Sequence, residues 1–337
     1  MKKRIGLVGF WNEFVPEESI VVQLMQKYYD VEITDPNEAD YIIFSSLGTP
    51  FEYLKYPQVR IMECYENVIP NYNFTDYCIS SIPAYYEDRG FYLPYCLRSQ
   101  HFQALKNINR DYSLKNIEDK PYFASFIASH ESENSLRGDF FKELSKYKHV
   151  ESVGSYLNNM EDGRTVDWTN NSKTDFQRKC KFNLCFESTK LDGFVTEKLV
   201  DAFFAESIPV YFGSDYAKTI FNPNAFIHCS DYETMDKAIE RIIELDNNDD
   251  EYLKMLSTPI LLDPTYYETK MEALDSFIQA IFDQPLEKAF RRPRCFLPKF
   301  EEDFILSKMN TRKLTDYSMK ELAKAMLLKF RKGGRKH

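Results

Sequence analysis

The segment between Cys180 and Gly213 has the residue order of a ligand-binding unit of an α/β fold. An apolar run at 182–186 predicts a buried strand, and a second apolar run at 208–212 predicts another. Between them, a polar loop leads into a predicted helix at 197–206. Because the loop leaves the carboxyl end of a strand, it lies at the edge of the sheet where open α/β folds bind their ligands.

Lys198 is the unusual residue of this segment, since it follows Thr196, a good N-cap, and so falls in the first turn of the helix. The positive end of the helix dipole opposes a cation there. An anion bound at the helix N-terminus reverses this effect, because the exposed backbone N–H groups and the ammonium both attract it. A diphosphate is the natural candidate. The alternative is a solvated lysine on a surface helix.

The rest of the chain alternates in the same way, which predicts an α/β fold with parallel sheets. The polar stretch at 109–120 is typical of a linker, so we expect two Rossmann-like domains that face each other across a ligand cleft. The remaining strands are predicted at 5–10, 41–44, 59–64, 77–80, 123–128, 150–153 and 226–229. The remaining helices are predicted at 17–28, 135–147 and 232–245, the last with Ser230 or Asp231 as N-cap.

The run FNLCFES…GFVTEKLVDAFF…IPVYFG resembles the donor-binding signature of the α1,3/α1,4-fucosyltransferases, glycosyltransferase family 10, and it looks most like the bacterial members. FASFIAS at 123–129, with Arg137 before Phe140-Phe141, is similar to the family's upstream block. RIMECYENVIPNYNFTDYCIS at 60–80 is similar to the block that contains the family's catalytic carboxylate. The resemblance runs in order from about residue 40 to residue 260.

The resemblance implies a GT-B fold with an N-terminal acceptor-binding domain at 1–115, a C-terminal GDP-fucose-binding domain at 121–285 and an extension at 286–337. It implies an inverting transfer of L-fucose from GDP-β-L-fucose to a glycan acceptor. The family expectation is the 3-hydroxyl of N-acetylglucosamine in N-acetyllactosamine-type glycans, with Lewis antigen products. GDP-fucose and an oligosaccharide are therefore the expected partners, and we expect no cofactor to be required.

Carried over position by position, the resemblance makes Glu66 the general base, with Glu63 as a nearby competitor. Arg137 and Lys198 are expected to bind the diphosphate, and Glu197 to hold a hydroxyl of the nucleotide sugar, on the ribose. The other expected donor-site positions are Glu187, Ser188, Phe194, Val195 and Thr196.

These residue types suit a single displacement. One carboxylate takes the proton of the attacking hydroxyl, while an arginine and a lysine stabilise the charge that develops on the departing diphosphate. With both cations present a divalent metal is dispensable, so no metal is expected. Ser188 stands where the family usually has Asn, and Phe194 where it usually has Tyr. Each change costs about 1 kcal/mol of hydrogen bonding, so we expect donor affinity or selectivity to differ.

The composition of the chain argues against several other classes of protein. The net charge of −9 argues against nucleic acid as a partner. Seven cysteines without a CxxC pair do not form a disulfide framework or zinc knuckle, and they favour a reducing cytoplasm. Two rival functions stay open: a GT-B glycosyltransferase that uses another nucleotide sugar, and a non-catalytic glycan-binding module. The oligomeric state is left open.

The C-terminal residues 311–337 differ from the rest, with nine Lys or Arg against Asp316 and Glu321. Apolar residues recur with helical spacing between Leu314 and Phe330. This pattern favours an amphipathic helix on the anionic inner face of the cytoplasmic membrane. The alternative is a helix that packs on the protein and ends in a disordered basic segment.

Overall fold

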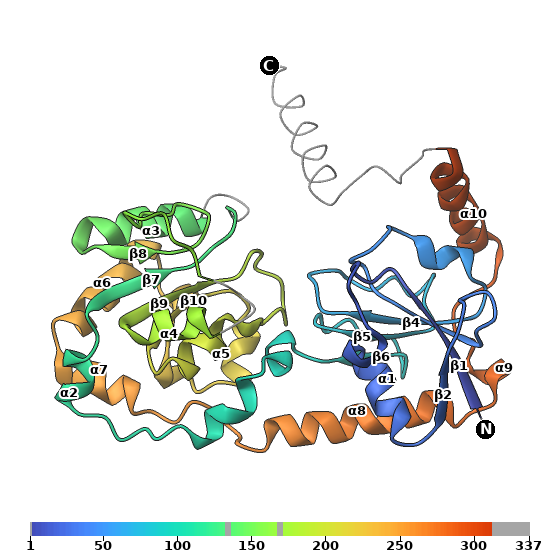
Figure 1. The fold of residues 1–337 in the computed structure, drawn as a ribbon, viewed down its shortest axis with the longest axis horizontal. Coiled ribbons are helices and arrows are strands. Elements are labelled where there is room, and N and C mark those ends of the chain that lie inside the picture. Colours follow the sequence, from blue (N-terminus) through green and yellow to red (C-terminus); the bar gives the residue numbers. More distant parts are fainter. Residues whose placement is uncertain (1, 132–135, 167–170, 312–337) are drawn as a thin grey trace. The chain divides into compact units, whose positions relative to one another are not determined.

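The computed structural model describes residues 2–131, 136–166 and 171–311 (Figure 1). The chain divides into two compact units. The first unit contains residues 1–64, 70–78 and 278–337, and the second contains residues 65–69 and 79–277. The predicted functional domains 1–115, 121–285 and 286–337 group the residues differently, and they stay a prediction about roles.

The first sheet has the strand order β2-β1-β3-β4-β5-β6. Strand β1 pairs in parallel with β2 and β3, and β3 pairs in parallel with β4, with Tyr41 opposite Val59. All residues of β3 and β4 are buried, as is usual for the apolar strands of parallel sheets. The strand bounds are β1 (Lys2–Val8), β2 (Asp30–Ile33), β3 (Tyr41–Phe44), β4 (Val59–Cys64), β5 (Tyr77–Ser80) and β6 (Gly90–Tyr92).

Helix α1 (Ile20–Gln26) begins later than predicted, because the hydroxyl of Ser19 caps it by accepting the Val22 N–H. A separate 3₁₀ turn, η1 (Pro16–Glu18), precedes it. The first unit also contains η2 (Glu52–Lys55), α9 (Leu286–Ala289) and α10 (Phe296–Thr311).

The segment that follows α8 is fixed to the first unit by Asp76. The carboxylate of this fully buried residue accepts the backbone N–H groups of Arg60, Arg291 and Arg292 at 2.7–2.8 Å. It also forms an ion pair with the Arg292 guanidinium. One buried charge therefore joins the loop before β5 to a segment more than 200 residues later.

The second sheet has the strand order β11-β10-β9-β7-β8, and all of its pairs are parallel. The central strand β9 is buried along its whole length, and Phe186 at its end lies opposite Phe212 of β10. The strand bounds are β7 (Tyr122–Phe126), β8 (Val150–Ser152), β9 (Cys180–Phe186), β10 (Ile208–Phe212) and β11 (Ile227–His228).

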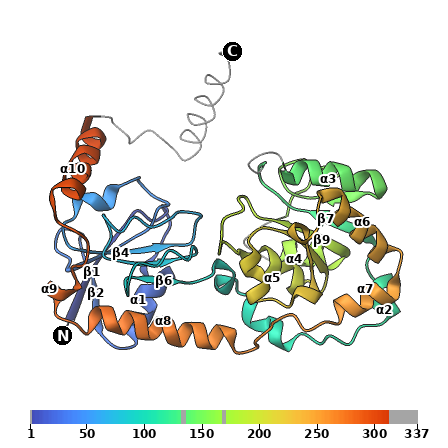
Figure 2. The ribbon, with the colours of Figure 1, turned by 180° about the vertical axis from the view of Figure 1, so that it is seen from behind.

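Helices cover both faces of this sheet. Helices α3 and α6 contact each other on one face, and α4 and α5 contact each other on the other face (Figures 1 and 2). The core between the sheet and α3 contains Phe126, Phe140 and Leu144. The bounds are α2 (Leu114–Glu118), α3 (Leu136–Tyr147), α4 (Ser172–Arg178), α5 (Glu197–Phe204), α6 (Met235–Asp246) and α7 (Asp249–Leu256), with 3₁₀ turns at η3 (Tyr95–Arg98), η4 (Phe102–Asn107), η6 (Asp215–Thr219), η7 (Pro223–Ala225) and η8 (Cys229–Asp231). Helix α8 (Tyr266–Phe282) begins in the second unit and ends in the first.

Most predicted elements are confirmed, and β3, β4, β5 and β10 have the predicted bounds. The sequence did not predict β2, β6 or α4. The proposed linker at 109–120 contains the short helix α2. The predicted N-cap of α6 was wrong: the helix begins after Thr234, whose hydroxyl accepts the Lys237 N–H.

None of the helices in the described part of the chain is both long enough and apolar enough to cross a membrane. The predicted amphipathic segment from Leu314 to Phe330 lies outside the described residues. Six of the seven cysteines are buried, and all seven are free thiols.

Candidate functional site

The loop between β9 and α5 is organised around the carboxylate of Glu187, whose side chain has no exposed surface. This carboxylate accepts the backbone N–H of Thr196 at 2.8 Å and the Thr196 hydroxyl at 2.7 Å. Thr196 occupies the predicted N-cap position of α5, but its hydroxyl bonds to Glu187 and makes no capping bond. The loop therefore closes on a buried charge at the end of the central strand.

Gly193 lets this loop approach the chain around residues 83–92. It has a positive φ of 76°, a conformation that favours glycine. Its N–H donates to the Ser214 hydroxyl at 2.8 Å, and its carbonyl accepts the Tyr92 hydroxyl at 2.6 Å. A Cβ added at this position would lie 2.2 Å from Cδ of Pro83.

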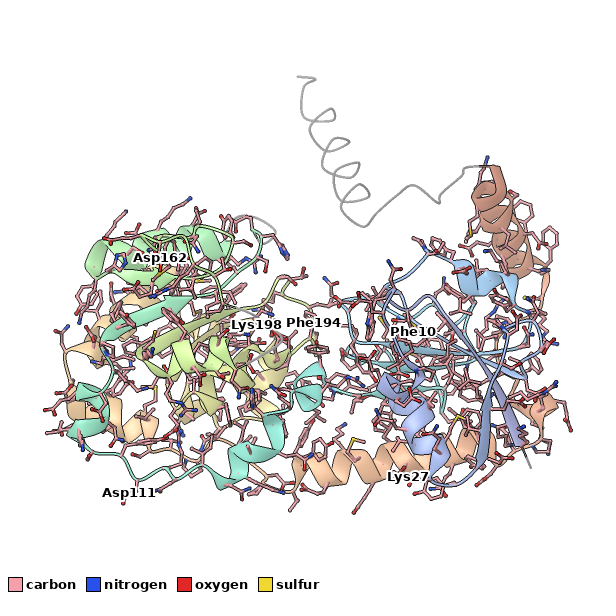
Figure 3. The ribbon with its side chains drawn as sticks, in the orientation of Figure 1. Phe10, Lys27, Asp111, Asp162, Phe194 and Lys198 are labelled. Carbon is pink, nitrogen blue, oxygen red and sulfur yellow. The ribbon has the colours of Figure 1, made fainter. Side chains whose placement is uncertain are left out.

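Lys198 lies in the first turn of α5 (Figure 3). Its side chain is 25% exposed, and its ammonium lies beside the Glu187 carboxylate. Its Nζ lies 3.1 Å from Glu187 and 3.6 Å from Glu197, and it donates to the Thr196 hydroxyl at 2.9 Å. Burial alone would lower the pKa of Lys198, but the two carboxylates outweigh burial and raise it. The alternative of a solvated surface lysine does not fit this environment.

Arg137 lies within the electrostatic range of the same loop. It lies in the first turn of α3, only 4% exposed, and donates to the carbonyl of His130. Burial lowers the pKa of Arg137, and the negative charges of Glu131 and Glu187 oppose that change. The pKa of His130 is lowered by burial and then by the positive charges of Arg137 and Lys198. The two cations therefore act on the same neighbours, Glu187 and His130.

Glu66 follows β4 in an exposed loop, yet it lies within the electrostatic range of this site. Nearby protein atoms partly desolvate its carboxyl group, which raises the pKa of Glu66. Lys198 opposes this rise, and Glu197 adds to it. The competitor Glu63 is only 1% exposed and accepts the Ser19 hydroxyl and the Ile20 N–H at the start of α1. Glu63 therefore has a structural role, which leaves Glu66 as the candidate carboxylate within the electrostatic range of Lys198.

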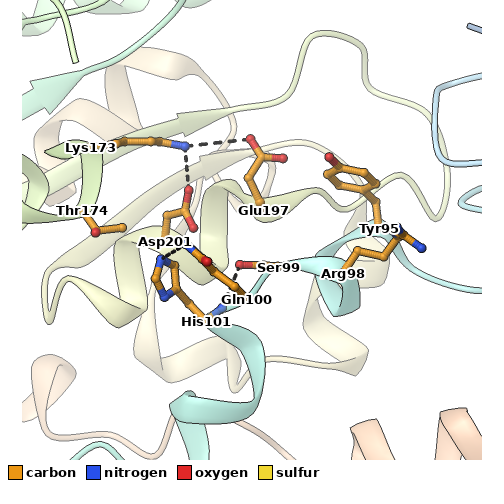
Figure 4. A pocket seen from close by; sticks show the side chains of 9 residues that line it. All are labelled: Tyr95, Arg98, Ser99, Gln100, His101, Lys173, Thr174, Glu197 and Asp201. Carbon is orange, nitrogen blue, oxygen red and sulfur yellow. Dashed lines mark hydrogen bonds and ion pairs between the residues drawn. The ribbon is translucent and has the colours of Figure 1, made fainter. Parts of the chain in front are cut away.

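Two further charged residues, Lys173 and Asp201, lie beside Glu197 and form a row of charges with it. The sequence did not predict either of them. Lys173 of α4 lies 3.9 Å from Glu197 and 2.7 Å from Asp201 (Figure 4). Charges of alternating sign thus follow one another from Glu187 through Lys198, Glu197 and Lys173 to Asp201. The sequence signal available was that Glu197 and Asp201, four residues apart, lie on the same face of α5 and need a positive partner.

The remaining predicted donor-site residues differ in how far their side chains are exposed to solvent. Ser188 is half-buried after the strand, whereas Phe194 is 4% exposed and Val195 is fully buried. The Val195 carbonyl accepts the Cys96 N–H at 2.9 Å, which fixes this part of the loop on η3. Thr196 is as buried as Phe194, whereas Glu197 and Lys198 are partly exposed and can present polar groups to a ligand.

One group of metal-ligating side chains lies elsewhere in the described part of the second unit. Side-chain atoms of Asp215, His228 and Asp231 lie within 4.8 Å of one another. Lys218 pairs with both carboxylates, at 2.9 and 2.5 Å. Its ammonium already supplies the positive charge that a metal ion would bring to them.

Both halves of the chain match models of known protein families. Residues 5–98 match the model of the alpha-(1,3)-fucosyltransferase FucT N-terminal domain, and residues 117–258 match the C-terminal model of glycosyltransferase family 10 (fucosyltransferase). The alpha-(1,3)-fucosyltransferase FucT of Helicobacter pylori is 30% identical over 320 residues, which cover 84% of this chain and 63% of that protein. The human 4-galactosyl-N-acetylglucosaminide 3-alpha-L-fucosyltransferase 9 is 27% identical over 143 residues, 41% of this chain and 37% of that protein.

Solved structures agree on the fold. A crystal structure of an alpha1,3-fucosyltransferase superimposes with a TM-score of 0.67 at 24% identity and covers 87% of this chain and 93% of that chain. The structure with GDP-fucose gives 0.62 at 24% identity, covering 82% and 90%. The fold is thus α/β of the GT-B type, with two parallel-sheet Rossmann-like domains. The chain spans less than two-thirds of the length of the curated relatives described here.

The geometry of the loop predicts a specific sensitivity at Gly193. Gly193→Ala and Gly163→Ala both place a side chain at positive φ, 76° and 64°, but Gly163 has open space around its missing Cβ. We expect Gly163→Ala to lower the free energy of unfolding by about 1–2 kcal/mol. Gly193→Ala is expected to lower it by about 1–3 kcal/mol more, because of the clash with Pro83. Urea denaturation followed by circular dichroism measures both, and equal losses would contradict the proposed close approach.

Proposed function

Because this chain belongs to glycosyltransferase family 10, the fucosyltransferases, we propose that it transfers L-fucose from GDP-β-L-fucose to a glycan hydroxyl with inversion at the anomeric carbon. One observation carries the proposal. Lys198 and Arg137 both act on Glu187, and Glu66 lies within the electrostatic range of Lys198. Two cations for a leaving diphosphate and one carboxylate for the incoming hydroxyl are the parts that a single displacement needs.

The two cations have complementary chemistry toward a diphosphate. Arg137 offers a planar set of donors that suits phosphate oxygens, and Lys198 offers a compact charge with three donors. The Lys198 ammonium already contacts Glu187 and Thr196, so these residues hold it in place for the ligand. With this arrangement we propose that no metal or other cofactor is required.

Glu66 is proposed to take the proton of the attacking hydroxyl. A carboxylate with a raised pKa is a stronger base than an ordinary one, and a base works best when its pKa approaches the working pH. We propose that the hydroxyl is O3 of N-acetylglucosamine in an N-acetyllactosamine-type glycan, with Lewis antigen products. The name of the human relative supports this choice, since it describes a 3-fucosyltransferase for 4-galactosyl-N-acetylglucosaminide.

The other predicted roles complete the proposal. Glu197 would hold a ribose hydroxyl, and Glu187, Ser188, Phe194, Val195 and Thr196 would shape the donor side. Residues 1–115 would then serve the acceptor and residues 121–285 the donor. Free, mostly buried cysteine thiols support a cytoplasmic location.

Substitutions at Glu66 and Lys198 should separate catalysis from donor binding. Glu66→Gln removes the base but keeps its shape, so we expect the Kd for GDP-fucose to stay within about twofold while kcat falls by about 10²–10⁴. Lys198→Met removes the charge that meets the diphosphate, so we expect that Kd to rise by about 10- to 100-fold. Isothermal titration calorimetry and a GDP-release assay with N-acetyllactosamine provide the two measurements.

Lys142→Met is the matched control. Because Lys142 lies on the exposed face of α3, its substitution should change neither the Kd nor kcat.

A panel of GDP-fucose, GDP-mannose and UDP-glucose tests the rival functions on the wild-type chain. Binding of UDP-glucose alone would favour another GT-B glycosyltransferase. Binding of GDP-fucose without GDP release for any glycan acceptor would favour a glycan-binding module. The reverse pattern for Glu66→Gln and Lys198→Met would mean that their roles are exchanged.

The raised pKa of Glu66 also predicts a pH dependence. A general base must be deprotonated, so kcat/KM should fall as the pH drops through the pKa of Glu66, at a higher pH than the ordinary value of about 4.3. The positive charge of Lys198 lowers the pKa of Glu66, so Lys198→Met should move the acidic limb to still higher pH. A pH profile of kcat/KM for both proteins measures this shift. An acidic limb at the same pH in both would contradict it.

The C-terminal region supports a second proposal, peripheral contact with the anionic inner face of the cytoplasmic membrane. Helix α10 exposes Phe296, Leu297, Phe300 and Phe304, with exposed fractions between 54% and 76%. The nine basic residues at 311–337 follow it directly. Exposed apolar side chains next to a basic segment are the two signals that peripheral binding usually combines.

Replacement of Arg331, Lys332, Arg335 and Lys336 by Gln should therefore weaken binding to vesicles that contain phosphatidylserine by at least about tenfold, since each charge near the surface contributes about 1 kcal/mol. Vesicle sedimentation of the full chain measures the change. Four exposed lysines of the second unit, Lys142, Lys146, Lys237 and Lys254, provide a control with the same charge change. An equal loss in the control, or no loss in either, would contradict the proposal.

A further inference from the structure

The loop that carries Glu66 belongs to the second unit, although the chain on either side of it belongs to the first. Residues 65–69 group with residues 79–277, whereas residues 1–64 and 70–78 lie in the first unit. We infer that Tyr65, Arg98 and Asn67 are positioning residues, which hold this loop on the second unit and so fix the place of the Glu66 carboxylate. The inference rests on the proposed role of Glu66 as the general base.

The first contact lies just before Glu66 in the chain. The Arg98 guanidinium lies over the Tyr65 ring, 4.2 Å from its centroid, and donates to the Tyr65 hydroxyl at 3.0 Å. The rings of Tyr65 and Tyr95 lie 6.2 Å apart. Arg98 and Tyr95 both belong to η3, which packs against α5 (Figure 4). Tyr65 is therefore attached, through η3, to the helix that begins with Glu197 and Lys198.

The second contact lies just after Glu66. The side-chain amide of Asn67 donates to the Thr189 hydroxyl at 3.3 Å. Thr189 belongs to the loop after β9, two residues beyond Glu187. The Val68 N–H also donates to the Glu66 carbonyl at 2.8 Å, which closes the loop into a tight turn. The two contacts thus hold Glu66 from both sides, and both lead to the β9–α5 segment that carries the proposed donor site.

Electrostatic effects agree with this placement. Burial raises the pKa of Tyr95, and the negative charges of Glu197 and then Glu66 raise it further. Tyr95 is therefore close enough to sense a carboxylate of α5 and the carboxylate of the loop at once. The charge of Lys198 in turn lowers the pKa of Glu66.

A fixed loop matters for catalysis because a general base must lie within hydrogen-bond reach of the proton that it removes. Glu66 is exposed, so its own burial does not fix its position. Holding a catalytic group in the productive geometry can supply a large part of a rate enhancement. Since the base and the cations proposed for the diphosphate belong to one unit, a movement between the two units would not separate them.

The two sides of the Tyr65–Arg98 contact can be tested separately. We expect Arg98→Ala to lower kcat for transfer to N-acetyllactosamine by about 5- to 30-fold, and to leave the Kd for GDP-fucose within about twofold. Tyr65→Leu removes the ring and should have the same effect. Tyr65→Phe keeps the ring below the guanidinium, so it should keep most of kcat.

Asn67→Ala tests the second contact, and we expect it to lower kcat by about 2- to 5-fold, the effect of one exposed hydrogen bond. Arg241→Ala is the matched control for Arg98→Ala. Arg241 pairs with Glu244 and Glu251 on α6 and α7, so its loss should leave both kcat and the Kd unchanged.

A double-mutant cycle distinguishes a positioning role from a general structural one. If Arg98 acts through Glu66, Arg98→Ala should lower kcat by less than about twofold once Glu66 is already replaced by Gln. An equal loss in both backgrounds would contradict the inference, and so would a Tyr65→Phe variant as slow as Tyr65→Leu.

The wild-type chain separates this inference from the proposed function. If it transfers fucose while Arg98→Ala and Tyr65→Leu keep the wild-type kcat, the positioning role is wrong and the proposed function stands. A wild-type chain that neither binds GDP-fucose nor releases GDP refutes the proposed function itself.

Discussion

The arrangement of the site depends on one buried negative charge, the carboxylate of Glu187. A buried carboxylate is strongly destabilising unless charged and hydrogen-bonding partners compensate it. Thr196 and Lys198 provide these partners, and both come from the start of the helix that follows. The conformation of the loop, the start of α5 and the direction of Lys198 are therefore linked. A change in any one of them would remove part of the compensation of this carboxylate.

This carboxylate interacts with two cations, Lys198 and Arg137. Lys198 and Arg137 would repel each other in a partly dehydrated space, but both interact favourably with Glu187. The site is thus charge-compensated before any ligand binds. The same alternation continues through Glu197 and Lys173 toward Asp201, where the positive charge is fully balanced.

The first unit uses a buried carboxylate in a comparable way. Asp76 joins the loop before β5 to Arg292, far along the chain. Glu63, one strand earlier, compensates the N-terminus of α1. Three acidic residues that look alike in the sequence, Glu63, Glu66 and Asp76, therefore have different environments. Two are buried in structural hydrogen bonds, whereas Glu66 is exposed and within the electrostatic range of Lys198.

The sequence by itself determined the five strands of the second sheet and the helices α3, α5 and α6, because continuous apolar runs and helical periodicity are local patterns. It also determined that Lys198 begins a helix after a buried strand, since Thr196 and the apolar spacing mark that position. Tertiary structure alone decided which charges meet. Lys173 and Tyr95 approach Glu197 only because α4 and η3 pack against α5, and the sequence did not predict α4. Pairing between segments far apart in the chain depends on packing, which no local pattern encodes.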